Sequence, residues 1–245
     1  MVYCGQAQME TPTAGHRTDQ TLREQVHTAV RVLKDGGVVA VPTDTLYGLA
    51  ASAFDERAVE RIYQIKGRPG GMALPLLLAN PWDIAKHTVD VPEVVWDLAD
   101  RFFPGALTLV LQKARHIPDL VSGGLDTIAV RVPDHWIPRE TARELGAPIT
   151  GTSANRTGTP GLTTAQAVRE QLGGEIDFVI DAGDFPRSIA STVLDVSGPW
   201  PTIVREGAVS RQALEEVCGV KVAVRERRGA ENLPLPQRDD SPRMA

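Results

Sequence analysis

Two short segments, far apart in the chain, carry the side chains best suited to binding a polyphosphate. The first is Lys66-Gly67-Arg68-Pro69 and the second is Gly151-Thr152-Ser153-Ala154-Asn155. Lys66 and Arg68 are two positions apart, so in an extended segment both point the same way and present paired positive charge. A solvated helix end is the ordinary alternative for such a pair. Together with the hydroxyls and amide of the second segment, the pair predicts a nucleoside triphosphate site.

The loops around these segments have compositions that suit ligand binding. Pro69-Gly70-Gly71 follows the basic pair and is suited to folding over a ligand. Ser153 and Asn155 are also two apart and can aim together at a base or a phosphate, while Gly151 and Gly161 leave room for backbone contact. A capped loop before a helix starting at Thr164 is the alternative reading of this segment.

The segment from Pro42 to Leu49 concentrates two threonine hydroxyls, a carboxylate and a phenol in one turn after an apolar strand. A small amphoteric ligand needs this mixture, because its ammonium requires acceptors and its carboxylate requires donors. Local side-chain hydrogen bonds at a strand corner explain the same residues equally well. The segment therefore marks a candidate amino-acid pocket.

Three further polar residues complete the candidates. Thr108 follows a tight turn on an expected strand, Ser191 precedes Thr192, and Arg205 ends another expected strand. Thr108 could equally be a β-former in the sheet, and Arg205 could simply pair with an exposed glutamate.

Several familiar site types are missing from the sequence. No GxSxG elbow and no GxxxxGK[ST] loop is present, and the histidines lack an HxxxH or HxH spacing. Cys4 and Cys218 lie near opposite ends of the chain, so neither a disulfide framework nor a cysteine metal site is expected. We therefore expect no metal site built from protein side chains.

The elements that must position these residues alternate between helix and strand. Periodicity and capping signals predict helices over 22–33, 55–66, 92–103, 136–145, 164–172 and 210–217. Strands are predicted over 38–41, 74–78, 107–112, 127–132, 147–150, 178–181, 192–196, 202–205 and 220–224. This order favours an α/β fold with one largely mixed, twisted sheet and flanking helices.

Composition and charge limit the class of protein. The chain has 245 residues, a net charge of −5, and no apolar run long enough to span a bilayer. Net acidity argues against a surface built for nonspecific nucleic-acid binding. We expect mobile tails at residues 1–18 and 226–245, a single domain over 19–225, no membrane association and a cytoplasmic location.

The motifs PTDTLYGL, KGRP, PGALTLVL, TSAN, STVLD and IVREG occur in this order. Together they resemble the YrdC-like family of threonylcarbamoyl-AMP synthases, over about residues 22–224. The resemblance implies a twisted α/β sheet around a large positive cavity, in the compact single-domain form. It implies condensation of L-threonine, bicarbonate and ATP to threonylcarbamoyl-adenylate and pyrophosphate, with Mg²⁺ on the triphosphate. The product would serve tRNA modification through partner transferase proteins.

The resemblance also assigns residues. ATP would be held by Lys66, Arg68, Met72, Thr108, Ser153, Asn155, Gly161 and Arg205, with Lys66 and Arg68 as the catalytic pair. Threonine would be held by Thr45, Leu77, Gln112, Gly151 and Ser191.

Two places in the sequence depart from the family pattern. Met72-Ala73 stands where relatives usually carry Lys or Asn followed by Pro, and Ala190 stands where an acidic residue is more usual. Two other functions compete with that of a synthase. The main alternative is a double-stranded RNA-binding or ribosome-assembly factor of the same fold that has no catalytic activity, and tRNA or double-stranded RNA is then a candidate partner. A carbamoyl-transferring enzyme is the third, although such proteins usually carry additional modules.

Overall fold

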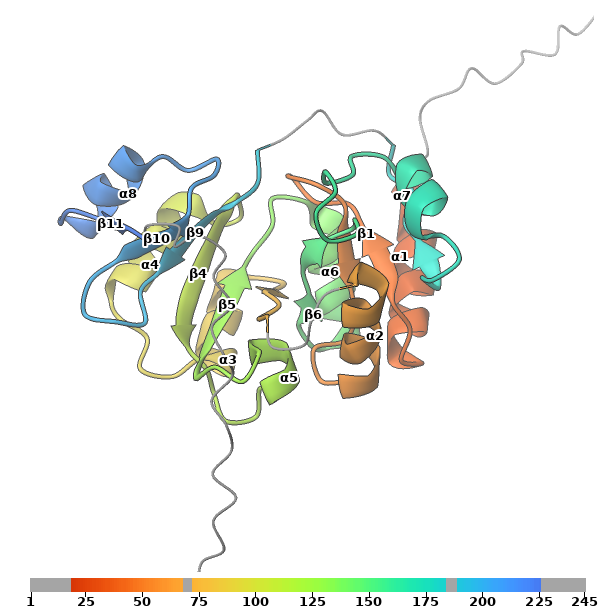
Figure 1. Cartoon of the computed structure of the whole chain (residues 1–245), viewed down its shortest axis with the longest axis horizontal. Coiled ribbons are helices and arrows are strands. Elements are labelled where there is room, and N and C mark those ends of the chain that lie inside the picture. The colour runs from red at the N-terminus through yellow and green to blue at the C-terminus, as the bar shows by residue number, and fades with distance from the viewer. Residues whose placement is uncertain (1–18, 68–71, 184–188, 226–245) are drawn as a thin grey trace, which may run out of the picture.

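A computed structural model of the chain describes residues 19–67, 72–183 and 189–225 (Figure 1). Within these ranges, the helices are α1 (Asp19–Lys34), α2 (Glu56–Lys66), α3 (Ile84–His87), α4 (Val94–Phe102), α5 (Asp119–Ser122), α6 (Trp136–Leu145), α7 (Ala165–Leu172) and α8 (Arg211–Cys218), with a 3-10 turn η1 (Pro81–Asp83). The expected tails at 1–18 and 226–245, the loop 69–71 and Arg68 lie outside the described residues.

The described strands form two sheets. The four-stranded sheet has the order β7 (Thr152–Ser153), β2 (Gly48–Ala50), β1 (Val39–Val41), β8 (Phe178–Val179). The seven-stranded sheet has the order β11 (Ala223–Val224), β10 (Thr202–Arg205), β9 (Thr192–Asp195), β4 (Leu107–Gln112), β5 (Thr127–Arg131), β3 (Leu76–Leu77), β6 (Ile149–Thr150). Both sheets mix parallel and antiparallel pairs, so the predicted mixed α/β class is confirmed.

The expected single sheet is divided in two at Gly151. β6 pairs with β3 in the larger sheet, and β7, after Gly151, pairs with β2 in the smaller sheet. A Cβ on Gly151 would lie 2.6 Å from Cγ of Leu77, so the chain can pass between the sheets here only because the side chain is absent. The hydrophobic pattern did not reveal this change of sheet, because each of the two strands is only two residues long and gives no period.

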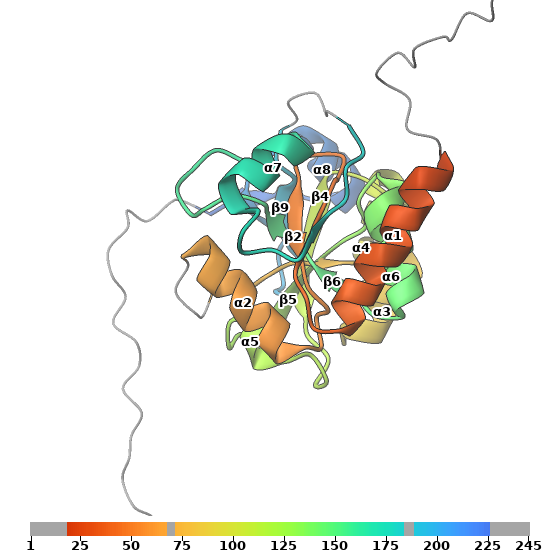
Figure 2. The same cartoon turned by 90° about the vertical axis from the view of Figure 1, so that its right-hand side faces the viewer.

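Two apolar clusters hold the layers together. α1 buries Val26, Ala29, Val30 and Leu33 against one face of the smaller sheet, where Ile137 of α6 joins them. Figure 2 shows α1 and α6 side by side on this face. The opposite face of the same sheet joins the larger cluster, which includes Ile62 of α2, Leu98 of α4 and Leu109 of β4. β1 is buried on both faces, which explains its continuous apolar sequence.

Capping residues set the helix boundaries that position the site. Asp55 accepts a hydrogen bond from the backbone N–H of Ala58 at 3.1 Å and starts α2, as its sequence predicts. Gly67 ends α2 in the left-handed conformation at φ 58°, so Lys66 is the last helical residue. Thr164 and Ser210 cap α7 and α8 in the same way as Asp55. None of the helices in the described part of the chain combines the length and apolar composition of a bilayer span.

Candidate functional site

The side chain of Lys66 is buried, at 5 % exposure, and reaches the segment from Ser153 to Asn155. Its Nζ donates to the carbonyl oxygen of Ser153 at 2.6 Å and to that of Asn155 at 2.8 Å, with Asn155 Oδ1 at 3.4 Å. The two segments that the sequence singled out therefore meet directly. In this arrangement, the ammonium is directed at the backbone of the second segment.

The side-chain amide of Asn155 holds the loop that follows it. Its Nδ2 donates to the carbonyl oxygens of Arg156 at 3.0 Å and Thr159 at 2.5 Å. β7 pairs with β2, and the N–H of Ala154 donates to the carbonyl of Tyr47 at 2.7 Å. The Ser153–Asn155 segment is thus fixed against the segment that follows Pro42.

The turn after Pro42 is organised by threonine hydroxyls. Oγ1 of Thr43 accepts from the N–H groups of Thr45 and Leu46, both at 3.1 Å, and donates to the carbonyl of Leu46 at 2.7 Å. Oγ1 of Thr45 lies 3.0 Å from Oγ1 of Thr43. The local hydrogen bonds of a strand corner, which the sequence left as an alternative, are present.

Arg131, on β5, joins this turn to the larger sheet. It donates from NH1 to Thr45 Oγ1 at 3.0 Å, from NH2 to Asp44 Oδ1 at 2.6 Å, and from Nε to the carbonyl of Gly105 at 2.9 Å. Burial lowers the pKa of Arg131, and the neighbouring Asp44 opposes that shift. A buried guanidinium with a carboxylate and a hydroxyl on one side is a recognition group for a second carboxylate or a phosphate.

Thr108, Ser191 and Arg205 form a second polar cluster. Thr108 lies on β4, Ser191 directly precedes β9, and Arg205 ends β10. Oγ1 of Thr108 lies 2.9 Å from Oγ of Ser191. Arg205 donates to the carbonyl of Ser191 from NH2 at 2.7 Å and from Nε at 3.2 Å, and to its Oγ at 3.0 Å. The described partner of Arg205 is therefore Ser191, and not the exposed glutamate that the sequence left as the alternative. The cluster follows from register, because β4 pairs with β9 and β9 pairs with β10.

The two arginines lie near each other across the sheet. β4 and β5 pair Leu109 with Val130, so one further step in the same register places Thr108 opposite Arg131. Burial lowers the pKa of Arg205, and the charge of Arg131 lowers it further. Two partly desolvated guanidinium groups that repel each other favour an anion between them.

Two glycines sit where a side chain would collide. A Cβ on Gly161 would lie 2.5 Å from Cδ1 of Leu46, in the same turn as Thr45, just as one on Gly151 would meet Leu77. Leu77 is itself the register partner of Arg131. Gly151, Gly161 and Leu77 are therefore adjacent to the polar groups. Their binding roles stay predictions.

Two predicted residues are not brought into this group by any contact in the described structure. Gln112 lies four residues beyond Thr108 on β4, roughly 13 Å along the strand, and donates to the carbonyl of Ser197 at 3.3 Å. Met72 has a side chain that is 50 % exposed, and its carbonyl accepts from the hydroxyl of Tyr63 at 2.7 Å.

Arg131 is the functional candidate that sequence reasoning missed, together with the specific role of Asp44. A signal was available, because Arg131 is the one charged residue in the otherwise apolar run from Ile128 to Val132. A buried arginine in a strand requires a partner. The partner, Asp44, lies 87 positions away in the sequence, so no local pattern identifies it.

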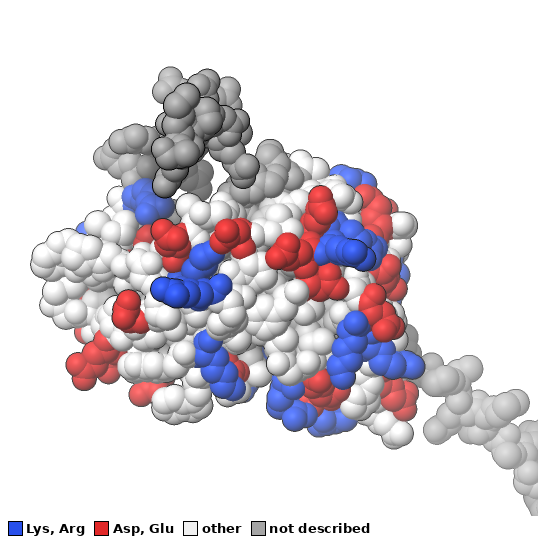
Figure 3. All heavy atoms as spheres, turned by 90° about the horizontal axis from the view of Figure 1, so that it is seen from below, with Lys and Arg blue, Asp and Glu red and all other residues white. Residues whose placement is uncertain are grey.

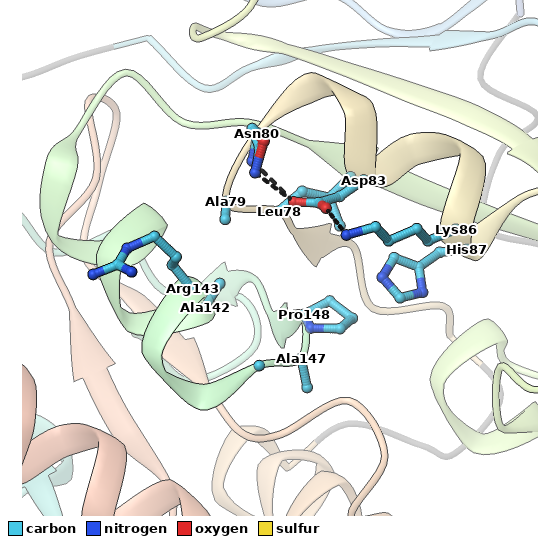
Figure 4. Close-up of a pocket in the computed structure, with 11 residues that line it drawn as sticks. Leu78, Ala79, Asn80, Asp83, Lys86, His87, Ala142, Arg143, Ala147 and Pro148 are labelled. Carbon is cyan, nitrogen blue, oxygen red and sulfur yellow. Dashed lines mark hydrogen bonds and ion pairs between the residues drawn. The ribbon is translucent and has the colours of Figure 1, made fainter.

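A pocket of about 220 Å³ lies outside this group (Figure 4). It is lined by Asp83, Lys86 and His87 from η1 and α3, and by Ala147 and Pro148 beyond α6. Asp83 bonds to Asn80 and pairs with Lys86 at 2.8 Å, so these charges are satisfied within the chain. The large positive cavity expected from the sequence stays a prediction.

Basic and acidic side chains are interspersed on the face of the described molecule seen in Figure 3. Many of the described cations are paired, as Arg61 is with Asp177 at 2.8 Å. The face in this view therefore has no continuous patch of basic side chains of the kind that nonspecific RNA binding requires.

Comparisons with known proteins identify the family. The family model Sua5_yciO_yrdC, described as "Telomere recombination", matches residues 31–207. A protein named threonylcarbamoyl-AMP synthase from Pyrococcus abyssi is 39 % identical over 195 residues, which are 80 % of this chain and 57 % of that protein. The chain belongs to the Sua5/YciO/YrdC family.

Other members of the family extend the comparison. A protein named putative threonylcarbamoyl-AMP synthase from Mycobacterium tuberculosis is 35 % identical over 80 % of this chain and 89 % of its own length. A crystal structure of P. abyssi Sua5 complexed with L-threonine is 38 % identical with a TM-score of 0.79, over 82 % of this chain and 58 % of that one. E. coli YciO is 27 % identical with a TM-score of 0.72, over 79 % of this chain and 93 % of its own. The chain thus spans less than two thirds of the Pyrococcus proteins that it matches.

Proposed function

We propose that this member of the Sua5/YciO/YrdC family is an L-threonylcarbamoyladenylate synthase. It would condense L-threonine, bicarbonate and ATP to threonylcarbamoyl-AMP and pyrophosphate, and so supply threonylcarbamoyladenosine modification of tRNA. The observation that carries the proposal is that two polar clusters, one at Thr45 and Arg131 and one at Thr108, Ser191 and Arg205, meet where strand register places Thr108 opposite Arg131. Relatives that bear this name support it.

The threonine pocket is assigned to the first cluster. The guanidinium of Arg131 and the hydroxyl of Thr45 would bind the carboxylate of threonine, since both can donate. Ser191 and the backbone at Gly151 would bound the polar side of the pocket, and Leu77 would contact the threonine methyl group. The threonine-complexed relative supports this choice of ligand. Gln112 has no role in this proposal, because of its distance along β4.

ATP is assigned to the second cluster and the Ser153–Asn155 segment. Arg205, with Thr108, would neutralise phosphate charge, and Ser153 with the backbone near Gly161 would contact the nucleotide. Arg68, which is not among the described residues, and Met72, which makes no described contact with this group, are assigned to ATP from the sequence alone. Lys66 would act indirectly, by holding the carbonyls of Ser153 and Asn155.

The chemistry needs alignment and charge neutralisation, and no protein nucleophile. The threonine nitrogen forms a C–N bond to bicarbonate-derived carbon, giving a carbamate with loss of water. A carbamate oxygen then forms a bond to the α-phosphorus while the bond to the β-phosphate oxygen breaks, and pyrophosphate leaves. Among the described residues, no group of three or more His, Cys, Asp or Glu is placed to hold a metal ion. The proposal therefore treats Mg²⁺ as part of the MgATP substrate.

The product is a reactive mixed anhydride, which requires a consumer close at hand. We assign that role to tRNA-modification transferase proteins in the cytoplasm. In this proposal, RNA is a downstream substrate of those partners.

The test is pyrophosphate release with each substrate omitted in turn. The complete mixture should release pyrophosphate, and omission of threonine, bicarbonate or ATP should abolish the release. Arg131→Lys keeps the positive charge but removes the planar set of N–H donors of the guanidinium. This variant should raise the KM for threonine more than the KM for ATP. Release that does not depend on threonine would overturn the proposal.

A further inference from the structure

An aromatic pair bordered by carboxylates is formed by Trp82 of η1 and Trp96 of α4. The rings of Trp82 and Trp96 stack with centroids 5.8 Å apart and an interplanar angle of 27°. Trp96 is partly buried against the main apolar cluster, whereas Trp82 is 72 % exposed. Trp82 is therefore a large apolar side chain that rests on a core-anchored ring and faces solvent.

The backbone beneath Trp82 is fixed. Trp82 lies in η1, where Asn80 and Asp83 form a capping box with bonds of 3.2 Å and 2.9 Å to Asp83 Oδ2. Since the ring is already held by stacking and by this turn, a partner that covers it loses little side-chain entropy. Such preformed, exposed tryptophans are typical of binding surfaces.

The carboxylates beside the two tryptophans indicate the charge of the binding partner. Glu93, Trp96, Asp97 and Asp100 recur at spacings of three and four, so they lie along one stripe of α4, and the three carboxylates are exposed. The nearest cations along the chain are already engaged, because Lys86 pairs with Asp83 and the guanidinium of Arg101 lies 5.7 Å from the ring centre of Phe102. An aromatic face beside carboxylates attracts guanidinium and ammonium groups and repels phosphate.

We propose that Trp82, Trp96 and the stripe Glu93–Asp97–Asp100 form a docking surface for a polypeptide segment rich in arginine or lysine. A basic side chain stacks on Trp82 by a cation–π contact, and its neighbours pair with the carboxylates of α4. A single-stranded RNA would also stack on tryptophan, but its phosphates would meet the acidic stripe. The proposal is independent of the synthase assignment, because none of these residues belongs to the candidate site.

The test is fluorescence anisotropy of a labelled peptide of alternating arginine and glycine, titrated with the full chain. The wild type should bind, and binding should weaken as salt rises. Trp82→Ala, and separately the double variant Asp97→Asn/Asp100→Asn, should each weaken binding at least about tenfold. Pyrophosphate release should stay unchanged in these variants, which separates this surface from the candidate site.

Matched controls distinguish a defined surface from general acidity. Trp200→Ala removes another tryptophan, 68 % exposed, whose neighbours from Ser197 to Thr202 are uncharged. Glu60→Gln/Glu170→Gln removes the same charge from α2 and α7, which Figure 1 shows at the other end of the molecule from α4. Neither control should weaken binding. No wild-type binding, equal losses in control and test variants, or Trp82-dependent binding of oligouridylate in place of the peptide would each overturn the proposal.

Discussion

Lys66→Met separates two roles for the buried lysine. Its ammonium lies within hydrogen-bonding distance of the carbonyls of Ser153 and Asn155, at 2.6 Å and 2.8 Å. Methionine has a similar length and no charge, so it fills a similar volume without the donors. If Lys66 holds the Ser153–Asn155 segment, the substitution destabilises the chain even without nucleotide. If Lys66 is only a phosphate ligand, stability without nucleotide is unaffected.

The size of the effect follows from the two carbonyls. Each one left without a donor costs about 1–3 kcal/mol, and relief of the buried ammonium's desolvation offsets part of that sum. We therefore expect a net loss of about 2 kcal/mol. For a chain of this size, such a loss lowers Tm by roughly 4–8 °C. Affinity for ATP should fall as well, because the segment that contacts it is no longer held.

The assay is thermal unfolding without ligands, followed by ATP titration calorimetry. Lys86→Met is the control, since that lysine is 70 % exposed and its pair with Asp83 is a surface pair; its Tm should change by no more than about 2 °C. If Lys66→Met has the same Tm as the wild type but binds ATP more weakly, the positioning role is refuted. A direct contact between Lys66 and phosphate then becomes the better explanation.

Three further predictions concern other parts of the chain. Arg131→Gln should cost roughly 3 kcal/mol in urea unfolding, because the carboxylate of Asp44 is left without its partner at 16 % exposure, and calorimetry should show threonine binding lost. Asp55→Ala should cost about 1 kcal/mol, through loss of the cap at the start of α2, in the same unfolding assay. Burial and the neighbouring His116 lower the pKa of His87 from its ordinary value of 6.5, so the unfolded chain gains a proton first and the free energy of unfolding should fall as pH drops below about 6.5.

Each of these predictions has a control. Asp44→Asn/Arg131→Gln should be less destabilising than Arg131→Gln alone, and equal losses would contradict the pairing. Glu56→Ala, next to Asp55 and exposed, should change stability by less than half as much as Asp55→Ala. His87→Asn should flatten the decline below pH 6.5, and an unchanged slope would assign it to other groups.

Local signals were sufficient to predict most of the fold. The cap at Asp55 and the stop at Gly67 set α2 as expected, and β4 and α6 have the predicted bounds. α1 starts at Asp19, three residues before the predicted start of this helix at residue 22, because frayed first turns carry little sequence signal. The short elements β2, β7, η1, α3 and α5 were not predicted, since a few residues give no measurable period.

The site was predictable where residue types are distinctive and not where partners are remote. The Lys66 and Ser153–Asn155 segments were correctly expected to meet, but burial directs the lysine to backbone carbonyls rather than to open space. Thr108, Ser191 and Arg205 were selected separately, and only strand register brings them together. The bridge from Arg131 to Asp44 depends on long-range packing that no local pattern contains.

The central claim is that the clusters at Arg131 and at Arg205 form one site for threonine and ATP. A crystal structure of the chain with L-threonine and a non-hydrolysable ATP analogue tests it most directly. The account predicts the threonine carboxylate at Arg131 and Thr45, with its amino group facing the phosphate held by Arg205. Threonine bound away from Arg131, or the two ligands in separate sites, would contradict it.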